Sequence, residues 1–224
     1  MGITKLSGPR PRSKPLLVKG HLYQFSSVLP LIRPRGDLPS LNAVIEKRHS
    51  VRNFRAPIPA SDLSALMWYA ARTKAKCVTP FGLWESRMSP SAGGCHPISL
   101  GVLNIRGMSD QAFVYDAQAH AMGCLDANSS SVAKALCEVS DCLDVKKATV
   151  LWLWADFSKS LRKYVNPESL VWRDSGALLA NILLVAQALG LRACALGIHD
   201  TLTLRRIFCV SPLVIGVGGC AVSR

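Results

Sequence analysis

The feature that most constrains this sequence is a long apolar run at residues 177–191, which reads ALLANILLVAQALGL. Its only polar side chains are Asn181 and Gln187, so a helix over the run has no hydrophilic stripe. Such a helix must be covered on every side by protein core, by a second subunit or by lipid. The run is shorter than the roughly 18 residues that cross a bilayer, which argues against a membrane. We predict a buried central helix, begun by residues 173–175 and ended at Gly190, that also builds a subunit interface.

The positive charge of the chain is concentrated at its beginning. The formal net charge is +13, and residues 1–55 contain 11 Lys or Arg against 2 Asp or Glu. Such a patch suits nucleic acid, a phosphate-bearing cofactor or an acidic peptide. Because no nucleic-acid motif accompanies it, nucleic-acid binding is disfavoured. Residues 1–36, rich in Pro, Gly and basic side chains, are predicted to form a basic N-terminal arm, and residues 37–224 a single domain.

Cysteine usage and the N-terminus indicate a cellular compartment. The eight cysteines contain no CxxC pair and do not cluster with His, so no metal site is predicted. Several lie in apolar runs, where cysteine acts as a small hydrophobe, and this usage is typical of a reducing compartment. No long apolar segment follows the basic start MGITKLSGPRPRSKP, so we predict no signal peptide and a cytoplasmic location.

Hydrophobic periodicity predicts that helices and strands alternate along the chain. Ser40 is expected to open the first helix, and Ser61 with Asp62 to cap the second. The expected helices cover 40–48, 61–75, 130–139, 175–190 and about 203–208, strands or core segments cover 98–105, 148–155, 192–198 and 213–218, and residues 113–125 form a hairpin that turns near Asp116. A loop is expected through Pro80 and Gly82. This order favours a sheet sandwiched between helices.

The first candidate site is the basic hexapeptide KRHSVR at residues 47–52. Arginine forks combined with hydroxyl and imidazole donors suit a phosphate group. The cationic and polar side chains of this site are Arg48, His49, Ser50 and Arg52. A solvated basic turn is the alternative.

The second candidate site is the segment SPSAGGCHP at residues 89–97. Its small residues let a planar ligand lie against the backbone, while amides and a hydroxyl donate to the edge of the ligand. The residues concerned are Pro90, Ser91, Ala92, Gly93 and Gly94. A plain surface loop is the alternative.

The third candidate site is the tripeptide Arg162, Lys163 and Tyr164. A lysine next to a tyrosine can serve acid–base chemistry if burial or a neighbouring cation lowers their pKa values. An ordinary amphipathic turn is the alternative for so short a motif.

The order of these motifs carries more information than each motif alone. KRHSVRNF, PSAGGCHP, the hairpin YDAQAHAM, a buried strand, RKY and DSGALLANILLVAQALGL follow one another between about residues 38 and 218. This succession resembles the nitroreductase superfamily of flavin enzymes, and within it the azoline dehydrogenases of the SagB/ThcOx type. The resemblance implies an α+β fold, in which a mixed, mostly antiparallel sheet is flanked by helices around a long buried central helix. The start of that helix, RDSGALLAN, departs from the family pattern.

The resemblance also implies FMN at the interface of an obligate homodimer. Arg48, His49, Ser50 and Arg52 would hold its phosphate and ribityl chain, and residues 90–94 of the other subunit would line the flavin ring. Residues Ala195, Leu196 and Gly197 would pack against the far face of the ring, and Arg224 is the one candidate for a further phosphate contact.

The activity implied by the resemblance is oxidation of thiazoline or oxazoline rings in a ribosomally made precursor peptide. Lys163 and Tyr164 would be the acid–base pair, one lowering the pKa of the other, and dioxygen would reoxidise the flavin. The basic arm is expected to recruit the peptide or a cyclodehydratase partner. Two alternatives remain: a general NAD(P)H-dependent nitro or quinone reductase, and a non-catalytic scaffold of a peptide-modifying complex.

Overall fold

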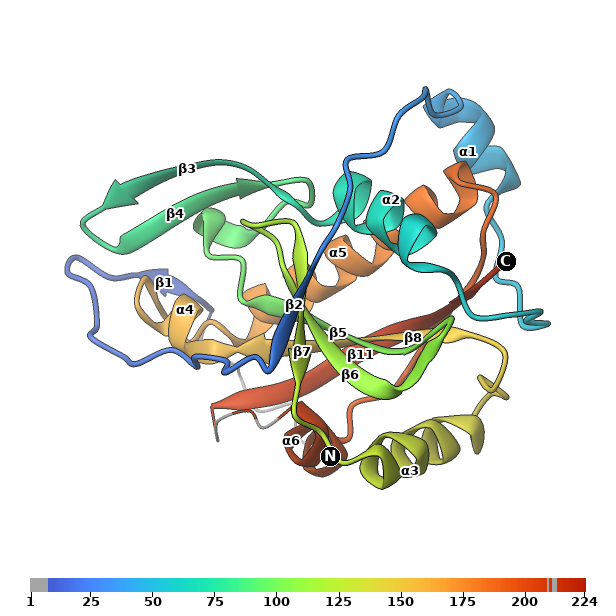
Figure 1. Cartoon of the computed structure of the whole chain (residues 1–224). Helices are drawn as coiled ribbons and strands as arrows, with labels where there is room; N and C mark the ends of the chain where they lie inside the picture. The colour runs from blue at the N-terminus through green and yellow to red at the C-terminus, as the bar shows by residue number, and fades with distance from the viewer. Residues whose placement is uncertain (1–7, 209, 211–212) are drawn as a thin grey trace, which may run out of the picture.

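The centre of the protein is a seven-stranded sheet in strand order β10-β11-β8-β5-β6-β7-β2 (Figure 1). The computed structural model describes residues 8–208, 210 and 213–224. The strands of this sheet are β2 (Ser27–Pro30), β5 (Ile98–Ile105), β6 (Met108–Asp116), β7 (Ala121–Leu125), β8 (Thr149–Asp156), β10 (Arg192–Leu196) and β11 (Val214–Ser223). All pairings between them are antiparallel.

Helices cover both faces of the sheet and complete a three-layer α+β architecture (Figure 1). One layer contains α2 (Ala60–Ala70) and α5 (Glu168–Ala188), with α1 (Leu41–Lys47) against α5. The other layer contains α3 (Ser129–Ser140) and α6 (Thr201–Phe208). The fold expected from the order of the motifs is therefore confirmed.

Strand β8 explains why the sheet needs helices on both faces. All eight of its residues are buried, and its large side chains alternate between two cores. Leu151 and Leu153 join the core beneath α2 and α5, whereas Trp152 and Trp154 join the core beneath α3 and α6. A strand that is apolar on both faces belongs in the centre of a covered sheet.

Helix α5 begins earlier than the sequence suggested. It starts at Glu168 after Pro167, so Asp174 and Ser175 lie inside the helix rather than capping it. Both are buried, and each makes a hydrogen bond outside the helix. The end of the helix matches expectation, because Gly190 adopts a positive φ of 70° just after it.

One side of α5 is not covered within the chain. Trp172, Gly176 and Ala180, spaced four residues apart, form an exposed stripe, and Trp172 is 51% exposed. By length and composition the helix would also pass as a membrane span. Its opposite side packs on α2, β10 and β11, as a core helix does.

The region after α2 differs from the sequence-based prediction. Helix α2 starts at Ala60 without a side-chain cap and ends at Ala70, and the chain then forms a hairpin of β3 (Thr73–Thr79) and β4 (Gly82–Arg87). The prediction that this helix continues through residues 71–75 is therefore wrong. A turn signal is present at Pro80 and Gly82, but only the first strand contains several β-branched residues, Thr73, Val78 and Thr79.

Residues 8–36 run along the body of the protein. Strand β2 extends the sheet at β7, and β1 (Arg10–Pro11) pairs with β9 (Tyr164–Val165), which follows α4 (Phe157–Leu161). Phe25 fills the space that a side chain at Gly123 would need, and the Tyr23 hydroxyl accepts a hydrogen bond of 2.9 Å from Trp154 Nε1. These contacts attach the segment to the sheet. The division into an arm and a domain at residue 36 remains a prediction.

Candidate active site

The PSAGG loop is held by a buried carboxylate of α5. Asp174 accepts a hydrogen bond of 2.5 Å from Ser91 Oγ at one oxygen and one of 2.9 Å from the Ala92 amide at the other. Ser91 Oγ also accepts from the His96 amide at 2.9 Å, which closes the loop on itself. Burial raises the pKa of Asp174, whereas the two hydrogen bonds lower it. The loop is thus fixed to the central helix across more than 80 residues of sequence.

Lys163 and Tyr164 lie directly on this loop. The Lys163 ammonium donates a hydrogen bond of 2.9 Å to the Gly93 carbonyl oxygen. A Cβ atom on Gly93 would collide with the Tyr164 hydroxyl and the Lys163 side chain, and Gly93 has a φ of 61°. Glycine is therefore required here both by the backbone and by the close approach of the pair. Two of the three motifs singled out from sequence meet in one place.

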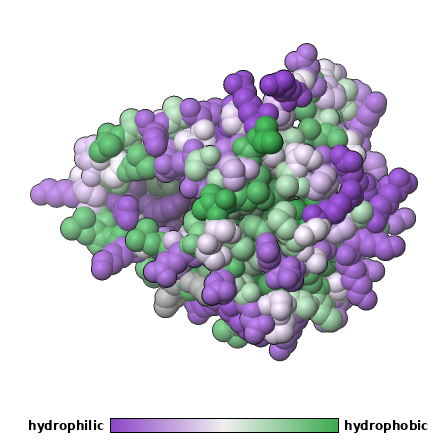
Figure 2. All heavy atoms as spheres, in the orientation of Figure 1, coloured by the Kyte–Doolittle hydropathy of each residue, from purple (hydrophilic) through white to green (hydrophobic). Residues whose placement is uncertain are grey.

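The β3–β4 hairpin covers the loop from a third side. The Trp84 indole occupies the space where a Cβ on Gly94 would lie. Trp84, Gly93, Gly94 and Lys163 line a cavity of about 190 Å³ that also includes Cys95. In Figure 2 a hydrophilic recess opens between the hairpin and the segment around β1 and α4. The candidate acid–base pair therefore borders an open, polar hollow.

The basic arm holds the backbone of the RKY tripeptide. The Arg12 amide donates to the Lys163 carbonyl at 2.8 Å, and the Leu16 amide donates to the Arg162 carbonyl at 3.1 Å. Arg12 Nε donates to the carbonyls of Leu161 and Tyr164, and the Arg162 guanidinium donates back to the Val18 carbonyl. The arm thereby positions the loop that carries Lys163 and Tyr164.

The protonation of Tyr164 differs from expectation. Burial, followed by the charges of Cys95 and Asp174, raises the pKa of Tyr164 above its usual value rather than lowering it. At neutral pH the phenol therefore stays protonated. It is suited to donating a hydrogen bond or a proton rather than to abstracting one.

The RHSVR motif lies at the other end of α5. The Val51 amide donates to the Ala193 carbonyl of β10 at 2.9 Å, which sets the motif beside the edge strand. His49, Ser50 and Arg52 are exposed. The guanidinium groups of Arg48 and Arg52 make no hydrogen bond or ion pair within the described ranges, so their donors are open to a ligand.

The remaining predicted contacts follow β10 and the chain end. Ala195 is exposed and Leu196 is buried on β10, the strand that Val51 approaches, and the exposed Gly197 directly follows it. Arg224 forms an exposed ion pair with Asp62 of α2, with Nε 2.5 Å from the carboxylate. Its role toward a phosphate remains a prediction.

The structure thus brings the motifs together in two groups. The PSAGG loop and the Lys163–Tyr164 pair lie near Asp174, whereas RHSVR lies next to β10, beyond the C-terminal end of α5. At 1.5 Å per residue, α5 rises about 21 Å between Asp174 and Ala188. The two groups of motifs are therefore separated along the length of α5.

Sequence reasoning missed three parts of this region. Asp174 was interpreted as a helix cap because it precedes an apolar run. The hairpin with Trp84 was interpreted as helix and loop. Lys159 of α4, which reaches the cavity near the loop, had no recognisable motif. Within the described residues no cluster of three or more His, Cys, Asp or Glu could hold a metal ion.

The comparisons with known proteins agree with this fold. The nitroreductase family model matches residues 45–222, so the chain belongs to the nitroreductase family. A nitroreductase-like structure from Ralstonia eutropha JMP134 is similar, with a TM-score of 0.70, 21% identity, and coverage of 97% of this chain and 98% of the other. One from Anabaena variabilis ATCC 29413 has a TM-score of 0.69, 18% identity, and coverage of 92% and 40%.

A third similar structure is a chain of the E. coli microcin synthetase McbBCD complex with truncated pro-MccB17 bound. It has a TM-score of 0.62 and 18% identity, with coverage of 92% of this chain and 78% of the other. At these identities the likeness concerns the fold. No curated protein matches the sequence.

The residues present fit FMN, the flavin typical of this family. Arg48 and Arg52, whose guanidinium groups have no partner among the described residues, and the Ser50 hydroxyl between them are a donor set for a phosphate. Residues 91–94 are half-buried and carry no bulky side chains, so a flat ring can lie close to their backbone.

We expect Asp174→Ala to loosen the PSAGG loop. The change leaves the Ser91 hydroxyl and the Ala92 amide without their acceptor, which costs about 1–3 kcal/mol of unfolding free energy. Urea denaturation measures the loss, with Asp110→Ala, an exposed aspartate on β6, as the control. Equal stability of the two variants would show that the carboxylate does not anchor the loop.

Proposed function

We propose that this protein is an FMN-dependent azoline dehydrogenase, which oxidises thiazoline or oxazoline rings of a precursor peptide to thiazole or oxazole. The observation that carries the proposal is the contact of Lys163 and Tyr164 with the PSAGG loop, at 2.9 Å from the Lys163 ammonium to Gly93. The similar fold of a chain in a microcin synthetase complex with a bound precursor peptide adds support. A cytoplasmic location and a cyclodehydratase partner belong to the same proposal.

The roles of the chain's own residues follow from this geometry. FMN, when bound, supplies the acceptor for two electrons. Arg48, His49, Ser50 and Arg52 would hold its phosphate and ribityl chain, with Arg224 as a further candidate, and residues 90–94 and 195–197 would flank the ring. Lys163 would remove the acidic proton from a carbon of the azoline ring, and the neutral Tyr164 phenol would orient that ring by donating a hydrogen bond.

The proposal includes a homodimer, because the two groups of site residues lie at opposite ends of α5. A second copy packed on α5 would bring the RHSVR motif of one chain to the PSAGG loop of the other. The exposed stripe of Trp172, Gly176 and Ala180 supplies an apolar surface for this packing. Leu41 and Ile45 of the adjoining α1 are 65% and 55% exposed and extend it. Burial of these side chains would stabilise the dimer.

The competing function is an NAD(P)H-dependent reductase. Similar folds include an NADH oxidase-like structure from Clostridium acetobutylicum, with a TM-score of 0.53 and 21% identity. That reading requires flavin and a dimer equally, but it assigns no task to Lys163 or Tyr164. A non-catalytic scaffold would need neither the pair nor bound flavin.

Arg48→Ala combined with Arg52→Ala is expected to release FMN. Each charge-assisted contact with a phosphate contributes about 1.5–3 kcal/mol, so the double variant should lose flavin affinity by two orders of magnitude or more. Absorbance at the flavin band of the purified protein, which should be near one flavin per chain in the wild type, measures this. Arg106→Ala, on the turn between β5 and β6, is the control, and unchanged flavin in the double variant would refute the assignment.

Ala180→Asp is expected to disrupt the dimer while each chain still folds. Its side chain is exposed in the single chain, so a monomer tolerates the carboxylate, whereas a buried interface does not. Ala133→Asp on α3 is the matched control, because it also places a charge on an exposed helical alanine. Analytical ultracentrifugation should give a flavin-poor monomer for Ala180→Asp and a dimer for the control. A flavin-loaded wild-type monomer would exclude the shared site.

Lys163→Ala and Tyr164→Phe are expected to keep FMN and the dimer and to lose azoline oxidation. A positioned acid or base contributes about 10²- to 10⁴-fold, and the double variant should be little worse than the worse single variant. Mass spectrometry of a cyclised precursor peptide counts two hydrogens lost per ring. Lys74→Ala and Tyr69→Phe are the controls.

The result also separates the two enzyme classes. A reductase would keep its turnover per bound flavin with NAD(P)H in both variants and would leave the cyclised peptide unchanged. Normal azoline oxidation by both single variants would remove the role proposed for the pair.

A further inference from the structure

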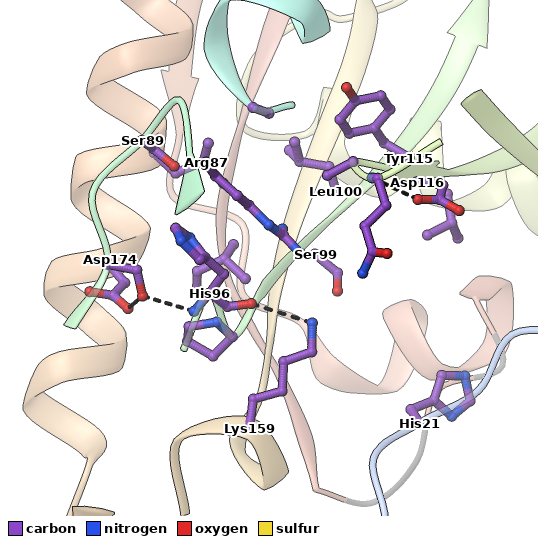
Figure 3. A pocket seen from close by; sticks show the side chains of 18 of the residues that line it. His21, Arg87, Ser89, His96, Ser99, Leu100, Tyr115, Asp116, Lys159 and Asp174 are labelled. Atoms are coloured by element: carbon purple, nitrogen blue, oxygen red, sulfur yellow. Dashed lines mark hydrogen bonds between the residues drawn. The ribbon is translucent and has the colours of Figure 1, made fainter. Parts of the chain in front are cut away.

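A second polar cavity lies inside the chain, behind the PSAGG loop. It has a volume of about 220 Å³ and is bounded by β4, β5, β6, α4, α5 and the arm, whose residues 21–25 close one side (Figure 3). Neither Lys163 nor any residue of the RHSVR motif lines it. Pro90, Ser91 and Asp174 lie in its lining, but no role above is assigned to its cations Arg87 and Lys159.

Lys159 extends from α4 into this cavity (Figure 3). Its ammonium group makes one hydrogen bond within the described residues, of 3.3 Å to the His96 carbonyl oxygen. An ammonium has three donors, so two of them remain for a ligand or water. Among the described residues, no carboxylate lies within 4.0 Å of the Lys159 ammonium. The salt bridges there are formed by Arg87, Arg206 and Arg224.

Arg87 reaches the same cavity from β4 (Figure 3). Its Nε and Nη2 atoms donate to one oxygen of Glu85, at 2.8 and 2.5 Å. Its Nη1 atom has no hydrogen-bond partner among the described residues. The other oxygen of Glu85 accepts from Gln118, so Glu85 has a donor at both oxygens.

Three other carboxylates near the cavity accept hydrogen bonds from backbone amides or a hydroxyl. Asp174 accepts from Ser91 and Ala92, Asp156 accepts from the His21 and Ser158 amides, and Asp116 accepts from the Gln118 and Ala119 amides. Both amides at Asp116 bond to its Oδ1, so within the described residues its other oxygen has no donor. The two cations likewise retain unused donors.

The electrostatic environment of Lys159 agrees with this count. Burial, and then the nearby charge of Arg87 and to a lesser extent that of Arg162, lowers the pKa of Lys159 to about 8, against the opposing effect of Asp156 and Glu85. Burial also lowers the pKa of His96 to about 4, so this imidazole is neutral at pH 7. A bound anion would offset the mutual repulsion of Lys159 and Arg87.

Part of the lining is apolar. Leu100, Val114 and Leu178 contribute to it, together with Phe25 of the arm. At about 30 Å³ per water molecule the space equals roughly seven waters, which admits a carboxylate with a short alkyl group. We propose that this cavity binds a small carboxylate, held by the Lys159 ammonium and the free Nη1 of Arg87, with its alkyl part against the apolar wall.

The carboxylate can come from a free acid or from the side chain of a bound peptide. Arg87, Gln118 and Lys159 line both this cavity and the one that borders Lys163, so the two share a polar wall. An acidic side chain could therefore enter from the candidate active site. The shared chemistry of both sources is the carboxylate group.

The test uses the full-length protein, with and without flavin, so its outcome is independent of the proposed activity. Titration with ¹³C-labelled acetate and propionate, at constant ionic strength kept with chloride, should give saturable binding by NMR. Lys159→Met should weaken this binding at least about tenfold, as expected for one charge-assisted hydrogen bond. Lys159→Arg should retain most of it, and Lys74→Met, a surface control, should bind as the wild type does.

A second set of titrations distinguishes the two sources of the carboxylate. Capped Gly-Asp-Gly that binds more tightly than acetate, with capped Gly-Asn-Gly not binding, identifies a peptide side chain; acetate binding without peptide binding identifies a free acid. The proposal is overturned if wild-type protein shows no saturable binding of any carboxylate, which would mean that the cavity holds only water. It is also overturned if Lys159→Met binds acetate as tightly as the wild type.

Discussion

Helix α5 has no polar side that water could solvate well, and the site residues are placed around it. Its buried side packs on α2 and the sheet, through residues such as Ile182 and Val185, and fixes the helix in the core. A carboxylate at Asp174 is tolerated in this position only because two donors of the PSAGG loop meet it. Because the buried carboxylate needs these two donors, the loop is fixed against α5. Lys163 and Tyr164 contact the loop in this position. The stripe of α5 that remains exposed is apolar, and it is the part of the helix for which one chain offers no cover.

Much of the fold could be predicted from the sequence because its signals are local. Strand β5 agrees with the expected residues 98–105, and the β6–β7 hairpin turns where Asp116, Gln118 and His120 interrupt two apolar runs. Boundaries failed where local signals competed. Asp174 looks like a cap because caps and buried hydrogen-bonding carboxylates share the same chemistry, and only the tertiary partner distinguishes them. The β3–β4 hairpin was missed because Ala and Lys extend helical periodicity beyond Ala70.

The candidate site was predictable in its parts but not in their arrangement. The order of the motifs indicates that PSAGG and RKY belong to the same fold. Their contact depends on how α4 and β9 are placed against the loop, which no local pattern encodes. The separation of RHSVR from PSAGG by the length of α5 is likewise a property of the topology. Lys159 and Arg87 had no signal at all, because a buried cation is defined by its surroundings rather than by its neighbours in sequence.

The basic arm shows how a charge pattern can mislead about partners. Its high positive charge first suggests a surface for an anionic partner, but Arg12 directs its guanidinium to the carbonyl oxygens of Leu161 and Tyr164. Arginine suits this task, because its planar fork can satisfy several carbonyls that would otherwise lack donors at the end of α4. The same segment carries Tyr23 and Phe25 into the sheet and closes the interior cavity. Part of the positive charge therefore orders the loop that carries Lys163 and Tyr164, and a change in the arm would reach the site through the backbone of that loop rather than through a lost binding surface.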